Sequence, residues 1–285
     1  MKELLNNKIA LVGGGVMGRG IAQLAAQCGF SPTLFNRSEA SKSRSKDLIK
    51  QKLTNASQKG RLNEGIDQVF DRIFFSCDLD EVLSEADLVI ESLPENKELK
   101  CQMFQIITKK APSHCVLATN TSSLSVSDIA IASGAPERFC GMHFFNPPIA
   151  MTLLELVTHK NLDDKILQWV VKMAEALNRD AIHVADVPGF ATSRLSVCIG
   201  LEAIRMVEQG VACAADIDKA MELGYRHPMG PLKLGDYIGL DVRLKVAEHL
   251  YQELKTETFN PPELLRKMVA EGKTGKKSGQ GFYAW

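Results

Sequence analysis

Short apolar runs and helical periodicities alternate through the first two-thirds of the chain. Between the runs, apolar side chains recur every three or four residues, as within residues 21–28 and 99–107, where each set shares one helix face. This alternation predicts an α/β fold with a doubly wound, mostly parallel sheet. The expected strands are Ile9–Val12, Thr33–Phe35, Arg72–Phe75, Leu88–Ile90, Val116–Thr119, Phe139–His143, Leu153–Val157 and Ala181–Val184.

The pattern changes at Pro188 and Gly189. Proline removes a backbone donor and glycine allows unusual dihedral angles, so this pair predicts a hinge. The following residues show no convincing strand and read as an all-α domain. Its first expected helix is amphipathic through Leu195, Cys198, Ile199, Ala203 and Met206. We therefore expect an α/β domain over residues 1–187 and an all-α domain over residues 188–285.

A glycine-rich turn follows the first expected strand. Gly13, Gly15 and Gly18, with Val16 and Met17 among them, form the pattern G-x-G-x-x-G at the start of a helix. In a Rossmann-type domain these glycines permit a tight turn, close approach of the backbone to a pyrophosphate, and close helix–strand packing. The N–H groups at the helix N-terminus then bind the phosphates. The strand before and the helix after the motif predict a dinucleotide site.

The second expected strand ends without the acidic residue that usually binds the ribose 2′-hydroxyl of NAD. Asn36 stands there, followed by Arg37 and Ser38. An aspartate would repel the 2′-phosphate of NADP, whereas asparagine does not, and Arg37 and Ser38 are candidates to bind that phosphate. In the alternative interpretation, Asn36 hydrogen-bonds the ribose and Arg37 stacks on the adenine. The expected cofactor is therefore NAD or NADP.

Polar residues lie at or after the later strands, in the segments 120–123, 143–148 and 153–157. Parallel strands bring their carboxyl ends to one sheet edge, where ligands bind. Glu155 lies on an apolar strand, and a buried carboxylate needs a partner. His143 is the obvious one. A Glu–His pair orients the imidazole and stabilises its cation, which predicts a general base near neutral pH.

Distinctive motifs stand in order along nearly the whole chain. They are GGGVMGRGIA (13–22), ESLPENKELK (91–100), NTSSLS (120–125), HFFNPP (143–148), LLELV (153–157), PGFATSRL (188–195), ELGYRHPMGPLKLGDYIGLD (222–241) and GKKSGQGFYAW (275–285). In content and order they resemble the 3-hydroxyacyl-CoA dehydrogenase family. The resemblance implies an enzyme that interconverts (3S)-3-hydroxyacyl-CoA and 3-oxoacyl-CoA. It also implies a homodimer formed through the C-terminal helical domain.

The resemblance assigns roles residue by residue. His143 matches the acid/base that takes the 3-hydroxyl proton as hydride leaves C3, and Glu155 matches the carboxylate that orients it. Ser122 matches the serine that binds the substrate oxygen beside the nicotinamide. The implied cofactor contacts beyond the glycine turn are Glu95, Lys100, Asn120, Ser122, Asn146 and Lys277.

One position departs from the family pattern. The family commonly has asparagine where Ser193 stands, and that asparagine helps to hold the substrate thioester and the catalytic pair. Serine can still donate and accept a hydrogen bond, but its side chain is shorter. Ser193 is therefore a further candidate catalytic residue whose reach is reduced.

Charge is unevenly distributed, although 34 Lys and Arg balance 34 Asp and Glu. Residues 37–61 hold eight basic residues against two acidic ones, and residues 78–98 hold eight acidic residues against one lysine. A solvated helix explains the basic arm, but in the family this arm binds the phosphates of coenzyme A, and Lys52 and Lys59 match the contacting positions. Zero net charge and the acidic stretch argue against a nucleic-acid partner.

The seven cysteines are scattered, odd in number and without a CxxC pair. They predict free thiols in a reducing cytoplasm rather than disulfides or a metal site, and we expect no metal. No apolar run reaches the roughly 18–20 residues of a membrane helix. The N-terminal apolar stretch is also too short for the core of a signal peptide.

The sequence thus predicts an NAD(P)-dependent 3-hydroxyacyl-CoA dehydrogenase, acting on short acyl groups such as 3-hydroxybutyryl-CoA or 3-hydroxyadipyl-CoA. One alternative is a dehydrogenase of a free hydroxyacid or sugar acid, which would not need the basic arm. Another is a nucleotide-binding structural or sensor protein without turnover, an interpretation that Ser193 favours.

Overall fold

The computed structural model describes residues 6–285 of the chain. The chain divides into two compact units, Met1–Asp186 and Val187–Trp285. Among the described residues, every strand of the sheet belongs to the first unit, and the second is built of helices. No helix in the described part of the chain is both long and apolar enough to cross a membrane.

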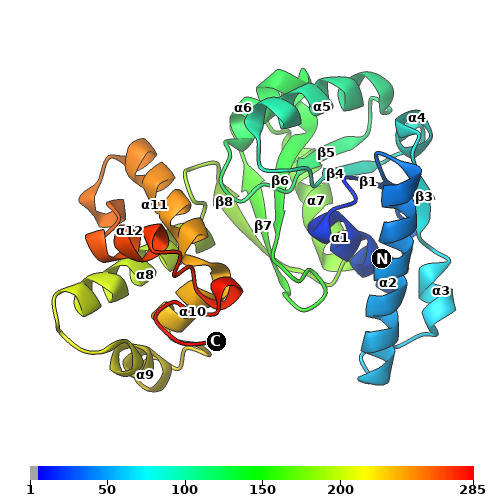
Figure 1. Ribbon diagram of the computed structural model, residues 1–285. Helices are drawn as coiled ribbons and strands as arrows, with labels where there is room; N and C mark the ends of the chain where they lie inside the picture. Colours follow the sequence, from blue (N-terminus) through cyan, green and yellow to red (C-terminus); the bar gives the residue numbers. More distant parts are fainter. Residues whose placement is uncertain (1–5) are drawn as a thin grey trace. The chain divides into compact units, whose positions relative to one another are not determined.

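The first unit is built on an eight-stranded sheet in the order β3-β2-β1-β4-β5-β6-β7-β8 (Figure 1). Its strands are β1 (Ile9–Val12), β2 (Thr33–Phe35), β3 (Phe74–Ser76), β4 (Leu88–Glu91), β5 (Val116–Thr119), β6 (Phe139–Phe144), β7 (Leu153–Thr158) and β8 (Asp180–Ala185). Strands β3 to β6 are parallel neighbours, whereas β7 runs antiparallel to β6 and parallel to β8. The strand order reverses between β1 and β4, and such a switch point is where doubly wound sheets bind ligands.

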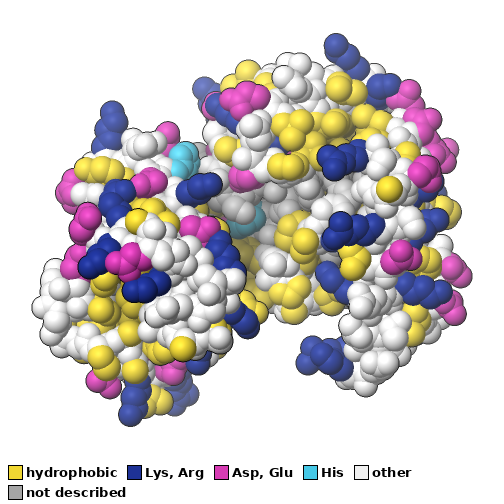
Figure 2. Space-filling view, viewed as in Figure 1, with side chains coloured by type: hydrophobic (Ala, Val, Ile, Leu, Met, Phe, Trp, Pro, Cys, Tyr) yellow, Lys and Arg dark blue, Asp and Glu magenta, His cyan; other side chains and the backbone are white. Residues whose placement is uncertain are grey.

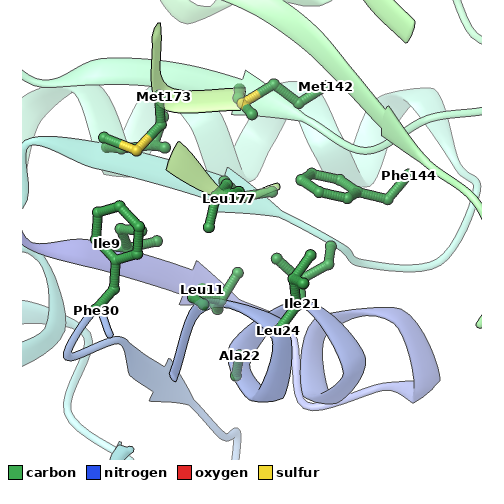
Figure 3. Packing of buried hydrophobic residues seen from close by; sticks show 14 of the residues in the cluster. Ile9, Leu11, Ile21, Ala22, Leu24, Phe30, Met142, Phe144, Met173 and Leu177 are labelled. Atoms are coloured by element: carbon green, nitrogen blue, oxygen red, sulfur yellow. The ribbon is translucent and has the colours of Figure 1, made fainter. Parts of the chain in front are cut away.

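Helices cover both faces of this sheet. They are α1 (Val16–Gln27), α2 (Glu39–Gln58), α3 (Ile66–Phe70), α4 (Leu79–Leu83), α5 (Lys97–Lys110), α6 (Val126–Ser133), α7 (Asp164–Ala176) and the 3-10 turn η2 (Pro136–Arg138). Alternate residues of a strand point to opposite faces. Ile9 and Leu11 of β1 therefore share a core with Leu24 of α1 and Met173 of α7 (Figure 3). On the other face, the Phe104 ring of α5 packs edge-on against Phe139, with 4.6 Å between ring centroids.

The second unit packs five α-helices around its own apolar core. They are α8 (Thr192–Glu208), α9 (Ala214–Gly224), α10 (Pro231–Ile238), α11 (Leu240–Leu254) and α12 (Glu263–Ala270), with the 3-10 turns η3 (Glu257–Phe259) and η4 (Lys276–Ser278). Buried residues of all five helices meet there, among them Leu201, Ile217, Leu232, Leu250 and Leu265. The carboxylate of Asp236 accepts backbone hydrogen bonds from Phe282 and Tyr283, which fixes the last residues of the chain against α10.

The predicted fold class is confirmed, since a mostly parallel, Rossmann-like sheet precedes a helical region. All eight predicted strands are present. Three have the predicted bounds, four gain one or two residues at their ends, and β3 begins at Phe74 instead of Arg72. The Arg72 guanidinium donates to the Ala26 carbonyl and pairs with Glu64 at 2.5 Å, so this residue tethers the loop before the strand.

The buried face of α5 differs from the expected one. The apolar pattern placed Leu99 and Ile106 on the face that shares the core, but both are exposed. Ile107 of the expected face is buried, together with Lys100 and Phe104, which were not predicted to be. A buried lysine rotates the helix away from its purely apolar stripe, and the ion pair described below explains why.

Candidate active site

The turn between β1 and α1 is tight enough to require glycine. Gly13 has a φ of +124°, and a Cβ there would lie 2.7 Å from the Ser92 carbonyl oxygen. A Cβ on Gly18 would lie 1.9 Å from the Gly13 oxygen, so α1 packs directly against the turn. Any side chain at either position would push the helix away from the strand.

The same turn leaves room for an anion. Gly15 and Val16 are exposed, while Met17 is half-buried against the core. Helix α1 has no side-chain cap and no acidic residue in its first turn. Its first N–H groups therefore have no intrahelical acceptor and fit the pyrophosphate of a dinucleotide.

His143 and Glu155 face each other across the antiparallel pair of β6 and β7. The imidazole Nδ1 lies 2.7 Å from Glu155 Oε2, and the two residues are only 5% and 0% exposed. A carboxylate can only accept, so Nδ1 carries the proton and Nε2 keeps its lone pair. The Phe145 ring packs 4.5 Å from the imidazole, centroid to centroid. The imidazole is thereby held as a proton acceptor at the end of β6.

Asn120, at the end of β5, ties together the ends of neighbouring strands. Its Oδ1 accepts from the Phe144 backbone N–H at 2.9 Å, and its Nδ2 donates to Ser92 Oγ at 3.4 Å. The predicted meeting of polar segments at one sheet edge is therefore present. Ser122 follows in the same loop with an exposed side chain.

Glu95 organises the loop that contains Ser122. Its Oε1 accepts hydrogen bonds from the Thr121 hydroxyl at 2.6 Å and from the Ser122 and Ser123 backbone N–H groups at 3.0 and 3.1 Å. Thr121 is buried beneath the loop. Glu95 thus holds in place the segment expected to bind substrate.

Lys100 is fully buried and forms an ion pair with Glu91, which is also fully buried. Its Nζ lies 2.7 and 3.0 Å from the two Glu91 oxygens and 3.7 Å from Glu95 Oε2. Glu91 also accepts from the Thr119 hydroxyl at 2.7 Å. The sequence singled out Lys100 and Glu95 as cofactor contacts and missed Glu91. A carboxylate that ends the apolar strand LVIE was the signal that a buried partner must exist.

Helix α2 forms the basic arm, and Figure 2 shows Lys and Arg side chains gathered over it. Lys52 lies on α2, and Lys59 is the C-cap residue directly after the last helical residue, Gln58. Burial, and next the charge of Arg19, lowers the pKa of Lys52. Neither lysine has an ion-pair partner within residues 6–285. The arm thus presents cationic charge available to an external anion.

The structure also describes three further predicted site residues, one in the first unit and two in the second. Asn146 is exposed in the loop between β6 and β7. In the second unit, Ser193 is half-buried in the first turn of α8, and the Lys277 amine lies 2.5 Å from the Asp241 carboxylate. Within the described part of the chain, no group of His, Cys, Asp and Glu is placed to hold a metal ion.

Comparison with known families accounts for both units. Residues 8–187 match the NAD binding domain of 3-hydroxyacyl-CoA dehydrogenase, and residues 189–285 match its C-terminal domain. The chain belongs to the 3-hydroxyacyl-CoA dehydrogenase family. The predicted resemblance is thereby confirmed, and the glycine turn described above belongs to an NAD-binding domain.

The chain of this 3-hydroxyacyl-CoA dehydrogenase aligns with individual relatives over nearly their full lengths. It is 40% identical to the probable 3-hydroxybutyryl-CoA dehydrogenase of Deinococcus radiodurans, over 98% of this chain and 100% of the relative. It is 36% identical to human mitochondrial hydroxyacyl-coenzyme A dehydrogenase, over 100% and 93%. The crystal structure of (S)-3-hydroxybutyryl-CoA dehydrogenase from Ralstonia eutropha superposes with a TM-score of 0.94 at 35% identity, over 98% and 99%.

These findings confirm the predicted enzyme class and the NAD(P) cofactor. The chain is an oxidoreductase of the 3-hydroxyacyl-CoA dehydrogenase family. Neither alternative, a dehydrogenase of free acids or a protein without turnover, is favoured by the relatives. The roles of the individual site residues stay predictions.

Proposed function

We propose that this 3-hydroxyacyl-CoA dehydrogenase interconverts a (3S)-3-hydroxyacyl-CoA and the matching 3-oxoacyl-CoA. Gly13, Gly15 and Gly18 would hold the dinucleotide, and its nicotinamide would supply the acceptor or donor of the hydride at C3 of the substrate. The observation that carries the proposal is the buried pair of His143 and Glu155 at 2.7 Å, close to the sheet edge that carries the cofactor turn. The His143 Nε2 takes the 3-hydroxyl proton, and Glu155 stabilises the resulting imidazolium. Ser122 donates to the same substrate oxygen.

The first test replaces His143. His143→Ala is expected to lower kcat by about 10²–10⁴-fold, because a positioned acid/base contributes a factor of that size. His114→Ala is the matched control, since that imidazole is exposed and pairs only with Asp87. The measurement is steady-state reduction of acetoacetyl-CoA. A near-normal rate in His143→Ala would remove the assigned mechanism.

We propose a short acyl group, as in 3-hydroxybutyryl-CoA or the dicarboxylic 3-hydroxyadipyl-CoA. The support is the naming of the relatives from Deinococcus radiodurans and Ralstonia eutropha as 3-hydroxybutyryl-CoA dehydrogenases. The test compares kcat/KM across 3-oxoacyl-CoA esters of four to sixteen carbons and 3-oxoadipyl-CoA. Highest kcat/KM with the longest chain would contradict the proposal.

Lys52 and Lys59 are proposed to bind the 3′-phosphate and diphosphate of coenzyme A. Lys52 lies on α2 and Lys59 is its C-cap residue, and both lack an ion-pair partner in the described chain. The double variant Lys52→Ala, Lys59→Ala is expected to raise KM for acetoacetyl-CoA about tenfold and to leave kcat near its normal value, because the lost contacts are equally strong in ground and transition states. Unchanged KM would contradict this assignment.

We further propose a homodimer formed through the second unit, here taken as residues 188–285, with residues 1–187 as the nucleotide domain. Leu195 and Ile199, one turn apart on α8, are 63% and 38% exposed, and such apolar exposure indicates a covered surface. Leu195→Glu with Ile199→Glu should give a monomer in light scattering. Ile131→Glu, at an exposed isoleucine of α6, is the control that should stay dimeric. A dimeric double variant would place the interface elsewhere.

We propose a cytoplasmic location because the cysteines form no disulfide bonds. All seven cysteines are free. Proteins of oxidising compartments tend to use cysteine in disulfides, whereas free thiols persist in reducing ones. Fractionation of the native host with an antibody to the protein tests this proposal.

A further inference from the structure

Asn36 occupies the position whose side chain usually hydrogen-bonds the ribose of a dinucleotide. In this structure, the Asn36 side chain points into the protein. Its Nδ2 donates to the Leu34 carbonyl at 3.0 Å, and its Oδ1 accepts from the Ser45 hydroxyl at 2.7 Å. The side chain lies under the glycine turn, because a Cβ on Gly14 would come within 2.3 Å of Asn36 Oδ1. Its exposed fraction is 0%. The amide is thus a structural brace between β2, α2 and the turn.

This burial separates the two interpretations of Asn36. A side chain with no exposed surface cannot hydrogen-bond a ribose that rests on the outside of the turn. A carboxylate that would attract the 2′-hydroxyl of NAD and repel a 2′-phosphate is also absent from the position. The residues left to face the ribose are the exposed Arg37 and Ser38.

Further cations surround the same turn. The Arg19 guanidinium donates to the carbonyl of Gly14 in the turn. Burial, and next the charge of Arg44, lowers the pKa of Arg19, which shows that these two cations repel one another. Arg19, Arg37 and Arg44 have no ion-pair partner within residues 6–285. Such a cluster is stabilised when an anion enters it.

The nearby acid does not cancel this charge. Glu39 accepts a hydrogen bond from the Lys42 amine at 2.7 Å, and this contact holds the pKa of the Glu39 carboxyl below its usual value. Glu39 is thus already paired with a cation of its own helix. The charges of Arg19, Arg37 and Arg44 stay uncompensated by any carboxylate of the described chain.

Arg37 stands apart from the proposed coenzyme A contact Lys59, whereas the charge of Arg19 reaches both Arg44 and Lys52. Arg44 and Lys52 stand eight residues apart on α2, which is about 12 Å along the helix axis. One phosphate cannot contact Arg37 at the N-terminal end of α2 and Lys59 at its C-terminal end. The helix therefore offers two phosphate positions, one at each end.

We propose that this 3-hydroxyacyl-CoA dehydrogenase uses NADP(H) in preference to NAD(H), with Arg37 binding the 2′-phosphate and Arg19 and Arg44 supplying the surrounding positive charge. The inference rests on the proposed function and names the cofactor of that same site. The Ser38 hydroxyl caps α2 by accepting from the Ser41 N–H at 3.3 Å, which fixes the start of the helix one residue after Arg37.

The test measures binding without turnover. Isothermal titration of the full-length protein compares 2′,5′-ADP, 5′-AMP and 3′,5′-ADP, which stand for the adenosine ends of NADP, NAD and coenzyme A. We expect 2′,5′-ADP to bind at least about tenfold more tightly than 5′-AMP. In Arg37→Gln, binding of 2′,5′-ADP should weaken by about 10–100-fold, while 5′-AMP changes by less than about threefold. Equal or tighter binding of 5′-AMP by the wild-type protein overturns the proposal.

Lys59→Ala is the matched control at the other end of the helix. It should weaken 3′,5′-ADP and leave 2′,5′-ADP unchanged. If Lys59→Ala weakens 2′,5′-ADP as strongly as Arg37→Gln does, the 2′-phosphate is bound at the coenzyme A position and the proposal fails. Asn36→Asp, checked for folding by its melting temperature, should lower the affinity for 2′,5′-ADP through repulsion by the new carboxylate.

Steady-state kinetics can test the cofactor preference and the proposed function separately. With acetoacetyl-CoA, kcat/KM for NADPH should exceed that for NADH, and Arg37→Gln should reduce the ratio. Reduction that runs best with NADH supports the function and overturns the cofactor preference. Selective 2′,5′-ADP binding in a protein that reduces no acyl-CoA ester supports the preference and overturns the function.

Discussion

The imidazole of His143 is useful as a base because of the residue directly opposite it. Antiparallel pairing of β6 and β7 puts Glu155 in register with His143, so the 2.7 Å contact is set by the backbone and not by flexible loops. Both side chains lie on the sheet face opposite to the core that contains Met142 and Leu154. The buried carboxylate is satisfied by the imidazole, and the imidazole is oriented by the carboxylate.

Glu155→Gln tests this pairing with little change in shape. The amide keeps the side-chain length but removes the charge that stabilises the imidazolium formed as the proton arrives. We expect kcat to fall by about 10²-fold while KM for acetoacetyl-CoA stays within about threefold. Glu175→Gln, on α7, should leave both constants unchanged. Loss confined to KM would show that Glu155 acts in binding instead of catalysis.

Gly18 and Gly65 offer a second contrast between single residues. A Cβ on Gly18 would collide with the Gly13 oxygen at 1.9 Å, whereas a Cβ on Gly65 would meet nothing within 4 Å at a φ of −63°. Gly18→Ala is therefore expected to cost about 1–3 kcal/mol of stability, or several degrees in melting temperature. Gly65→Ala should melt within about one degree of the wild type. Equal melting temperatures in calorimetry would contradict the tight packing of α1.

At the scale of elements, apolar runs predicted the strands well because buried parallel strands are almost uniformly apolar. The four residues of β1, β4 and β5 are all buried. Helix faces were predicted less well, since a helix buries only a stripe and its rotation depends on neighbours. In α5 that rotation follows from Lys100, whose burial no hydrophobic pattern can anticipate because it requires Glu91 from another element.

Some residues of the candidate site could also be predicted from the sequence, and others could not. Residues whose role follows from the chain direction, such as Asn120 and His143 at strand ends, could be located from sequence. The inward turn of Asn36 could not, because it depends on hydrogen bonds to Leu34 and to Ser45 of the next helix. The sequence therefore indicated where the cofactor binds but left two interpretations of the ribose position.

The ion pair of α5 with β4 can be tested against an exposed pair on the same helix. Lys100→Met leaves the fully buried Glu91 without a cation, which is expected to cost about 3–5 kcal/mol. Lys97→Ala removes an exposed pair with Asp128 and should cost no more than about 1 kcal/mol. Urea denaturation followed by circular dichroism measures both.

A rescue variant makes the ion-pair test specific. Adding Glu91→Gln to Lys100→Met removes the stranded charge and should recover part of the lost stability. If the destabilisation of the double variant equals the sum of the two single effects, Glu91 and Lys100 contribute independently and the pair is not the cause.

At the scale of the whole molecule, the net charge is zero because a basic segment and an acidic segment cancel each other. Helix α2 and the turn before it are basic, whereas the segment from α4 to the start of α5 is acidic. Helix α2 is linked to the cofactor turn by the hydrogen bond from Ser45 to Asn36. Positive charge is therefore concentrated where phosphates are expected to bind. A salt titration of NADPH binding should therefore show affinity falling as ionic strength rises.

The rate at which cysteine thiols are alkylated tests how well the core of the first unit is closed to solvent. Burial raises the pKa of Cys140 to about 12 and that of Cys115 to about 12, whereas Cys213 is exposed. Only a thiolate attacks iodoacetamide, and at pH 8 a thiol with a pKa near 12 is ionised to the extent of about 10⁻⁴. Peptide mass spectrometry should find Cys213 alkylated in the native protein, with Cys140 and Cys115 alkylated only in urea. Native labelling of Cys140 at the rate of Cys213 would mean that the sheet opens far more often than its buried contacts allow.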